Sequence, residues 1–182
     1  MKRLFLLLAG VVLLSSCDKD NNSSRYDDLI SSFDLSQMDQ TQFVQALTTE
    51  VLCFNDADAY VEGFGWGCDR LGVVYGWRGI LCAPDGTSNY FRISPPFIGP
   101  IEAPKVICIC GQWTFDSHTG MFTIDASQDY KIEAKVVYYK YPRLILDGML
   151  GHHGRFRWDC FFSKEDPQAL LDSCDSFVDV NK

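Results

Sequence analysis

The chain has 182 residues, with 24 Asp and Glu against 16 Lys and Arg, so its formal net charge is −8. This acidic balance argues against nucleic-acid binding, which needs a basic face, and against a broad cationic contact with anionic lipid. Aromatic residues make up 14% of the chain, and its length suffices for one domain with a well-packed core.

The N-terminus has the parts of a secretory signal peptide. Lys2 and Arg3 precede an apolar run at 4–14, which is too short to span a bilayer by itself. The alternative is an ordinary buried N-terminal helix with a free cysteine. It fits poorly, because the run lacks the polar face that an amphipathic helix of a globular domain should show. Ser15, Ser16 and Cys17 follow directly.

The stretch Leu14-Ser15-Ser16-Cys17 resembles the bacterial lipobox. This resemblance implies a diacylglycerol on the Cys17 sulfur, cleavage before Cys17 and acylation of the new amino group. Residues 1–16 would then be the signal peptide, and their loss would change the formal net charge from −8 to −10, because Lys2 and Arg3 leave with them. Two or three acyl chains anchor a protein stably, so the expected partner is a membrane, reached through Cys17.

The residues after Cys17 predict a flexible tether and a cellular location. Residues 18–24 contain no apolar side chain, so 17–33 is expected to be the lipidated cysteine and a flexible tether, ahead of one β-rich domain at 34–182. The acidic start resembles the surface-export signal of Bacteroides-type lipoproteins, which implies an outer-membrane, surface-exposed protein. Asp18 directly after the cysteine also resembles an inner-membrane retention signal, so the periplasmic face of the inner membrane is the alternative.

One helix is predicted before the strands begin. Residues 26–33 have a mixed pattern and are expected to be irregular. Ser36 and Asp39 resemble a capping box. Phe43, Val44, Leu47 and Val51 then recur at one-face helical spacing, which predicts a short helix over 37–50.

From 60 to 162 the pattern indicates short strands and tight turns. Residues 130–138 alternate most clearly, with Tyr130, Ile132, Ala134, Val136 and Tyr138 on the buried face. Residues 155–162 alternate in the same way. Phe156, Trp158, Cys160 and Phe162 are expected to face inward, and Arg155, Arg157 and Asp159 outward.

Other strands are placed by the turns between them. Residues 112–115 and 121–124 flank a glycine-terminated loop, and 83–87 forms a turn between strands at 79–82 and 89–93. Further strands are expected at 71–77, 105–110 and 144–148, with a proline-rich loop at 95–104. A last short helix is expected near 165–174, capped by Ser163 or Asp166, with Pro167 in its first turn.

These elements predict a mainly β fold with short helices at both ends. About eight strands joined by local hairpins favour an antiparallel meander that closes into a small barrel, because closure removes exposed edges. An open β-sandwich is the alternative. The layout of lipobox, tether, helix and β-meander resembles the small lipocalin-like lipoproteins. Their Gly-x-Trp spacing occurs at Gly111-Gln112-Trp113, in mid-domain rather than near the first strand.

Seven cysteines remain after Cys17, and their connectivity stays open. They are Cys53, Cys68, Cys82, Cys108, Cys110, Cys160 and Cys174. Export favours disulfides, and an odd number leaves at least one thiol free or paired between chains. Cys108 and Cys110 share one face of a strand, which strains a mutual bridge. Free buried thiols that act as small apolar side chains are the alternative.

No motif predicts an enzyme, a cofactor or a metal site. The glycines at 63, 65 and 67 lack the Lys-Ser/Thr of a phosphate-binding loop, so bends in strands explain them better. His118, His152 and His153 have no zinc-type spacing with the cysteines. No cysteine, histidine or carboxylate pair stands in a recognisable catalytic context, so hydrolysis is only the secondary alternative.

Aromatic side chains favour a binding function. Tyr138, Tyr139 and Tyr141 end the clearest strand, and Trp66 and Trp77 lie among glycines. The first hypothesis is a non-catalytic envelope lipoprotein that binds a small apolar or amphipathic ligand in the mouth of a β-barrel. The second is an adhesion or accessory module that contacts glycan or protein through exposed aromatic side chains. The residue pattern does not identify the ligand, the oligomeric state or the residues that line a binding site.

Overall fold

A computed structural model describes residues 23–54, 60–61, 65–66, 77–93, 106–126, 131–151 and 155–179. The helices are α1 (Ser23–Ser31), the 3₁₀ turn η1 (Leu35–Gln37), α2 (Gln40–Thr49) and α4 (Pro167–Asp172). The strands are β1 (Val51–Phe54), β2 (Tyr60–Val61), β3 (Gly65–Trp66), β4 (Trp77–Cys82), β5 (Thr87–Ile93), β6 (Val106–Asp116), β7 (Met121–Asp125), β8 (Ile132–Lys140), β9 (Arg143–Leu150), β10 (Arg155–Ser163) and β11 (Ser176–Asp179).

Eight strands form a closed antiparallel barrel. From β4 to β10, each strand pairs with the next along the chain, and β1 pairs with both β4 and β10. Val51 lies opposite Ser163 and Leu52 lies opposite Ile80, so β1 closes the ring. This closure confirms the predicted barrel and rules out the open β-sandwich, in which the first and last strands would be edges.

Two short elements extend the sheet outside the ring. β2 and β3 continue from β10, and β11 adds to β6 in parallel. The sequence pattern does not indicate β11. The two strands predicted at 105–110 and 112–115 are one continuous strand, β6, from Val106 to Asp116.

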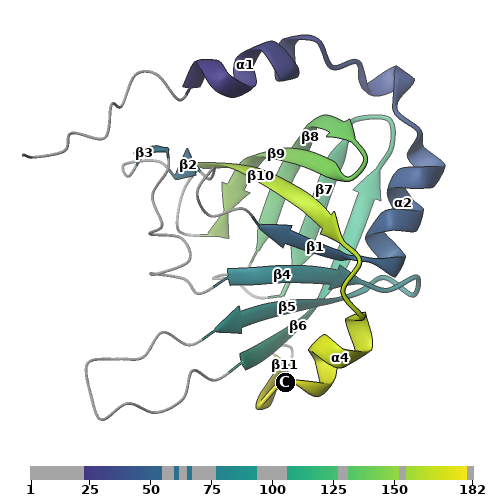
Figure 1. Cartoon of the computed structure of the whole chain (residues 1–182), viewed down its shortest axis with the longest axis vertical. Coiled ribbons are helices and arrows are strands. Elements are labelled where there is room, and N and C mark those ends of the chain that lie inside the picture. Colours follow the sequence, from purple (N-terminus) through teal and green to yellow (C-terminus); the bar gives the residue numbers. More distant parts are fainter. Residues whose placement is uncertain are drawn as a thin grey trace, which may run out of the picture.

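The helix α2 covers one end of the barrel (Figure 1). The Phe43 side chain is fully buried, and its ring centroid lies 4.7 Å from that of Phe115, 5.0 Å from that of Tyr139 and 6.3 Å from that of Phe162. These partners come from β6, β8 and β10, so one residue joins three walls of the ring. The predicted helix is therefore confirmed, but Val44, expected on its buried face, is 37% exposed.

The predicted helix caps hold in part. The N-cap of α2 is Asp39, whose carboxylate accepts from the backbone N–H of Gln42, so Ser36 does not cap this helix as expected. Asp166 caps α4, with Pro167 in the first turn, as the sequence predicted. Residues 26–33, predicted as irregular, mostly belong to α1, which begins at Ser23.

The tight turns lie at the α2 end of the barrel. They join β4 to β5, β6 to β7 and β8 to β9, and the first two use Gly86 and Gly120 at positive φ. The strand ends for the other four connections (β1–β4, β5–β6, β7–β8 and β9–β10) all lie at the opposite end. The predicted strand at 71–77, apart from Trp77, and the proline-rich loop fall outside the described residues.

Buried apolar side chains fill the described interior of the barrel. The core includes Leu52, Ile80, Tyr90, Ile109, Phe122, Ile124, Ile132, Leu144, Leu146, Phe156, Trp158 and Phe162. The inward set predicted for β10 is confirmed. Asp159, predicted to face solvent, is only 7% exposed, because Arg143 pairs with it.

Candidate functional site: a cleft between α1 and β8

The helix α1 packs against the outside of the barrel. Tyr26 is 1% exposed and forms a small apolar cluster with Ile145 of β9. Leu29, Ile30, Val137 and Tyr138 pack around this pair. Because these contacts lie outside the ring, α1 adds a second, smaller core to the molecule.

An irregularity in β8 creates the surface that α1 covers. The register of β8 against β9 shifts between Val136 and Tyr138, so Val137 has no partner of its own. The alternation therefore changes phase, and Tyr139 rather than Tyr138 is buried toward the core. Tyr138, predicted to share the inner face, packs against α1 instead.

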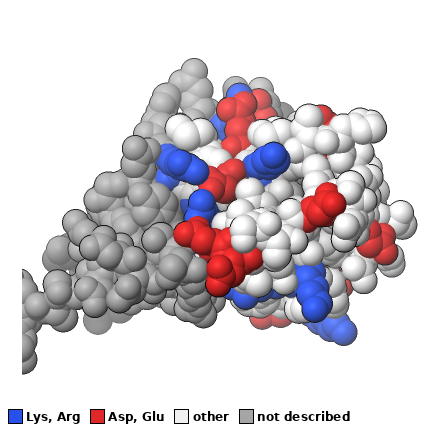
Figure 2. Space-filling view, turned by 90° about the horizontal axis from the view of Figure 1, so that it is seen from above, with Lys and Arg blue, Asp and Glu red and all other residues white. Residues whose placement is uncertain are grey.

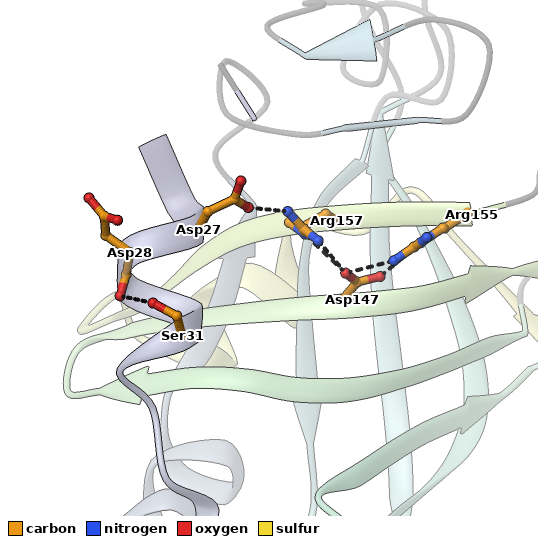
Figure 3. A network of polar contacts seen from close by, with 6 residues as sticks. All are labelled: Asp27, Asp28, Ser31, Asp147, Arg155 and Arg157. Atoms are coloured by element: carbon orange, nitrogen blue, oxygen red, sulfur yellow. Dashed lines mark hydrogen bonds and ion pairs between the residues drawn. The ribbon is translucent and has the colours of Figure 1, made fainter. Parts of the chain in front are cut away.

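A network of charges joins α1 to β9 and β10 (Figure 3). Asp147 accepts from Arg157 through Oδ2, at 2.8 Å from Nη2, and from Arg155 through Oδ1, at 3.2 Å from Nε. Arg157 also reaches Asp27 of α1, with 3.4 Å between Nη1 and Oδ1. Figure 2 shows acidic and basic side chains interspersed on this face, beside a broad uncharged area.

The arginines hold Asp147 in its charged form. Partial burial alone would raise the pKa of this carboxyl group, and it is the largest single influence. The hydrogen bonds and positive charges of Arg155 and Arg157 together outweigh it, so the pKa of Asp147 lies below its ordinary value.

A second ion pair anchors Tyr26. Arg143 donates to Asp159 through Nε and Nη2, each at 2.7 Å, in a bidentate arrangement. The Arg143 guanidinium carbon lies 5.5 Å from the centre of the Tyr26 ring. The α1 helix therefore rests on both apolar and cationic contacts.

A cleft of about 360 Å³ opens where α1 ends and η1 begins. Its lining consists of Ile30, Phe33, Asp34, Leu35, Lys135, Val136 and Val137. Five of these side chains are apolar, and a carboxylate and an ammonium group complete the set. This volume lies at the small end of the range for ligand pockets.

The two charged residues of the cleft differ in their availability. Asp34 accepts from the backbone N–H and the hydroxyl of Ser36 and from Gln37, and the Ser36 bonds hold the pKa of this carboxyl group below its ordinary value. Lys135 is exposed and forms no ion pair with any residue that the structure describes. The cleft therefore offers one uncommitted cation beside apolar walls.

The three tyrosines predicted as binding candidates do not form one surface. Tyr139 is buried and donates to Gln42 at 3.4 Å, and Tyr141 donates to Glu50 at 3.1 Å, so both contact α2 or its end. Only the backbones of Trp66 and Trp77 are described, in β3 and β4. The cleft was not predicted, because the sequence gives no sign that residues 30–35 meet residues 135–137.

The other sequence candidates are separated or lie outside the described residues. His118 lies in the β6–β7 turn, where its backbone N–H donates to Asp116. His152, His153, Cys68, Cys17 and the glycines at 63 and 67 are not among the described residues. Within the described part of the chain, no three His, Cys, Asp or Glu side chains are placed to hold a metal ion, and no helix is long and apolar enough to cross a membrane.

Comparison with known proteins adds a distant structural likeness. No model of a known protein family and no curated protein matches this chain. A deswapped triple mutant of bovine odorant binding protein has 12% sequence identity and a TM-score of 0.31. The match covers 70% of this chain and 82% of the bovine one.

Proposed function

We propose that this protein is a non-catalytic lipoprotein of the cell envelope that binds a small amphipathic ligand. The observation that carries the proposal is the cleft between α1 and β8, with apolar walls and the exposed ammonium group of Lys135. An anionic head group would pair with Lys135, while a short apolar tail would lie against Ile30, Phe33 and Val137.

The site differs from the barrel mouth in which the ligand was first expected. Buried side chains fill the described interior of the barrel, whereas the cleft lies on the outer wall. The binding experiment therefore needs variants that discriminate the cleft from the mouth.

The test is a titration with dodecanoate, which displaces a fluorescent anionic probe such as anilinonaphthalene sulfonate. Lys135→Met should weaken dodecanoate binding roughly fivefold, because it removes one charge-assisted contact worth about 1 kcal/mol. Lys140→Met removes an exposed lysine from the other end of β8 and is the matched control. Val137→Trp should block the cleft without entering the interior of the ring.

The outcomes separate the two sites. Loss of binding in Lys135→Met and Val137→Trp, with Lys140→Met unchanged, supports the cleft. Equal binding by all variants would move the ligand to the barrel mouth. Absence of binding by the unaltered protein, tested also with neutral and cationic amphiphiles, would contradict the proposed function.

The adhesion hypothesis receives no specific support from the described surface. Its most exposed aromatic side chains are Phe177 (59%) and Phe161 (44%). Phe161 belongs to β10, whereas Phe177 belongs to β11, which pairs with β6 across the ring. These residues do not form a continuous patch.

We also propose that Cys17 carries the lipid anchor, on the outer membrane and facing the exterior. The support is the order of charged residues, apolar run, small residues and cysteine at 2–17.

Cys17→Ala should abolish incorporation of labelled palmitate and move the protein out of the membrane fraction. Cys174→Ala is the control, because it removes another cysteine and leaves the N-terminus intact. Unchanged labelling of Cys17→Ala would refute the anchor. Protease access in intact cells would distinguish the surface from the inner-membrane alternative.

A further inference from the structure

The C-terminal segment is fixed against the outside of β6. In β11, residues from Ser176 to Asp179 pair in parallel with residues from Ile107 to Cys110. Just before this strand, the Asp175 N–H donates to the Val106 carbonyl at 2.9 Å, and the Asp175 carboxylate accepts from the Val106 N–H at 2.7 Å. Figure 1 shows α4 and β11 next to β6, at the bottom of the view. Cys174 is therefore held close to the start of β6.

Three cysteine side chains meet at this place. Cys108 and Cys110 both donate to the Asn89 side-chain oxygen, with Sγ–Oδ1 distances of 3.3 Å and 3.5 Å. Cys174 donates to the Leu170 carbonyl at 3.5 Å, and its thiol lies close enough to that of Cys108 for each to influence the pKa of the other, as Cys110 also influences Cys108. Cys108 is fully buried, whereas Cys110 and Cys174 are partly exposed.

We propose that Cys108 and Cys174 form a disulfide that attaches the C-terminal segment to the barrel. The Cys108 and Cys174 thiols are neighbours, and they come from segments far apart in the sequence. Cys110 lies two residues from Cys108 on the same strand face, where a mutual bridge is strained. This assignment resolves a connectivity that the sequence left open.

The reaction is thiol–disulfide exchange with an external disulfide, such as that of an oxidoreductase. Cys174, the more exposed of the pair, loses its proton and attacks one sulfur of the external disulfide, and the other sulfur leaves as a thiolate. Cys108 then loses its proton, attacks Cys174 and releases the second external thiol. Two cysteine thiols are oxidised, one external disulfide is reduced, and the two protons end on the external thiols.

The surroundings leave Cys110 as the free thiol. Burial is the main cause that raises the pKa of the Cys108 thiol, and the neighbouring Cys174 and Cys110 raise it further, so attack by Cys108 is the slow step of the exchange. The strain of a Cys108–Cys110 bridge keeps Cys110 out of the product.

The test exposes the full chain to oxidised glutathione, alkylates the remaining thiols under denaturing conditions and maps the tryptic peptides by mass spectrometry. Cys108 and Cys110 fall on one tryptic peptide, and Cys174 falls on another. The expected product is these two peptides cross-linked, with one alkylated cysteine. Dithiothreitol should remove the cross-link and speed amide exchange in β11.

Single substitutions identify the partner. Cys110→Ser should keep the cross-link, while Cys108→Ser and Cys174→Ser should lose it. A cross-link that persists in Cys108→Ser and disappears in Cys110→Ser would overturn the assignment. So would complete alkylation of Cys108 and Cys174 in the oxidised, unaltered chain, a result that does not depend on the folding of any variant.

Discussion

Gly148 shows how a single residue sets the distance between two strands. It lies on β9 opposite Ala134 of β8, and a Cβ added there would collide with the Glu133 carbonyl and with Ala134. The obstacles are mainly backbone atoms of a neighbouring strand, which cannot rotate away as the end of a side chain can. The close approach of β8 and β9 therefore requires glycine at this position.

Gly148→Ala should consequently destabilise the protein, because the added methyl group must push the two strands apart. We expect the free energy of unfolding to fall by about 1–3 kcal/mol. Chemical denaturation checks this value. Met149→Ala is the matched control, since that side chain is 48% exposed on the same strand, and it should change stability little. Equal stability of the two variants would mean that β8 can yield at this point.

At the scale of elements, α1 depends on long-range contacts rather than on its own sequence. It is a nine-residue helix, too short to be stable alone in water. Tyr26 provides the apolar contact, and Asp27 connects the helix to Arg157 and thereby to Asp147. This dependence explains why the sequence pattern at 26–33 indicated no regular structure.

The Asp147 network predicts a loss of stability in acid. The pKa of this group is lowered by folding, so its contribution is present above its unfolded pKa of about 3.9 and is lost as the pH falls through the lower folded value. Asp147→Asn should reduce the free energy of unfolding at neutral pH by about 1–3 kcal/mol and should flatten its decline below about pH 4.

Urea denaturation from pH 2 to pH 7 measures both effects. Asp28→Asn is a suitable control, because Asp28 is exposed on α1 and its carboxylate takes no part in the network of Figure 3. If Asp147→Asn kept the pH dependence of the unaltered protein, other carboxyl groups would be responsible for the acid sensitivity.

Sequence patterns predicted elements that depend on their own neighbours and missed those that depend on distant ones. The alternation of β10 was decisive because a period of two holds from Phe156 to Phe162. In β8 the same rule failed after Val136, since the irregularity is coupled to the packing of α1. The cleft brings residues 30–35 beside residues 135–137, which are far apart in the sequence, so no local pattern indicated it.

At the scale of the whole molecule, the ring has no free edge among its eight strands. β1 is only four residues long, yet it pairs on both sides, with β4 and with β10. Because paired amides must open before they exchange, closure should protect β1 as well as longer strands. In an open sandwich, the same strand would be an edge.

Hydrogen exchange tests this closure directly. We expect Leu52 and Cys53 amides to be protected to a degree similar to that of β8 and β9 amides. The exposed face of α4 supplies an internal reference, because its residues are all partly or fully exposed and should exchange faster. Rapid exchange in β1 with slow exchange in β8 would show that the ring opens at the β1–β10 pair.

The even number of strands has a consequence for how this protein can vary. Because neighbouring strands alternate in direction, the tight turns lie beside α2, and the four remaining connections all attach at the far end of the barrel. One end thus behaves as a constant framework, while the other can accept insertions without disturbing the Phe43 contacts. A library that randomises the four connections would therefore vary one end of the barrel and keep the α2 end constant, and natural sequence divergence can do the same in this chain.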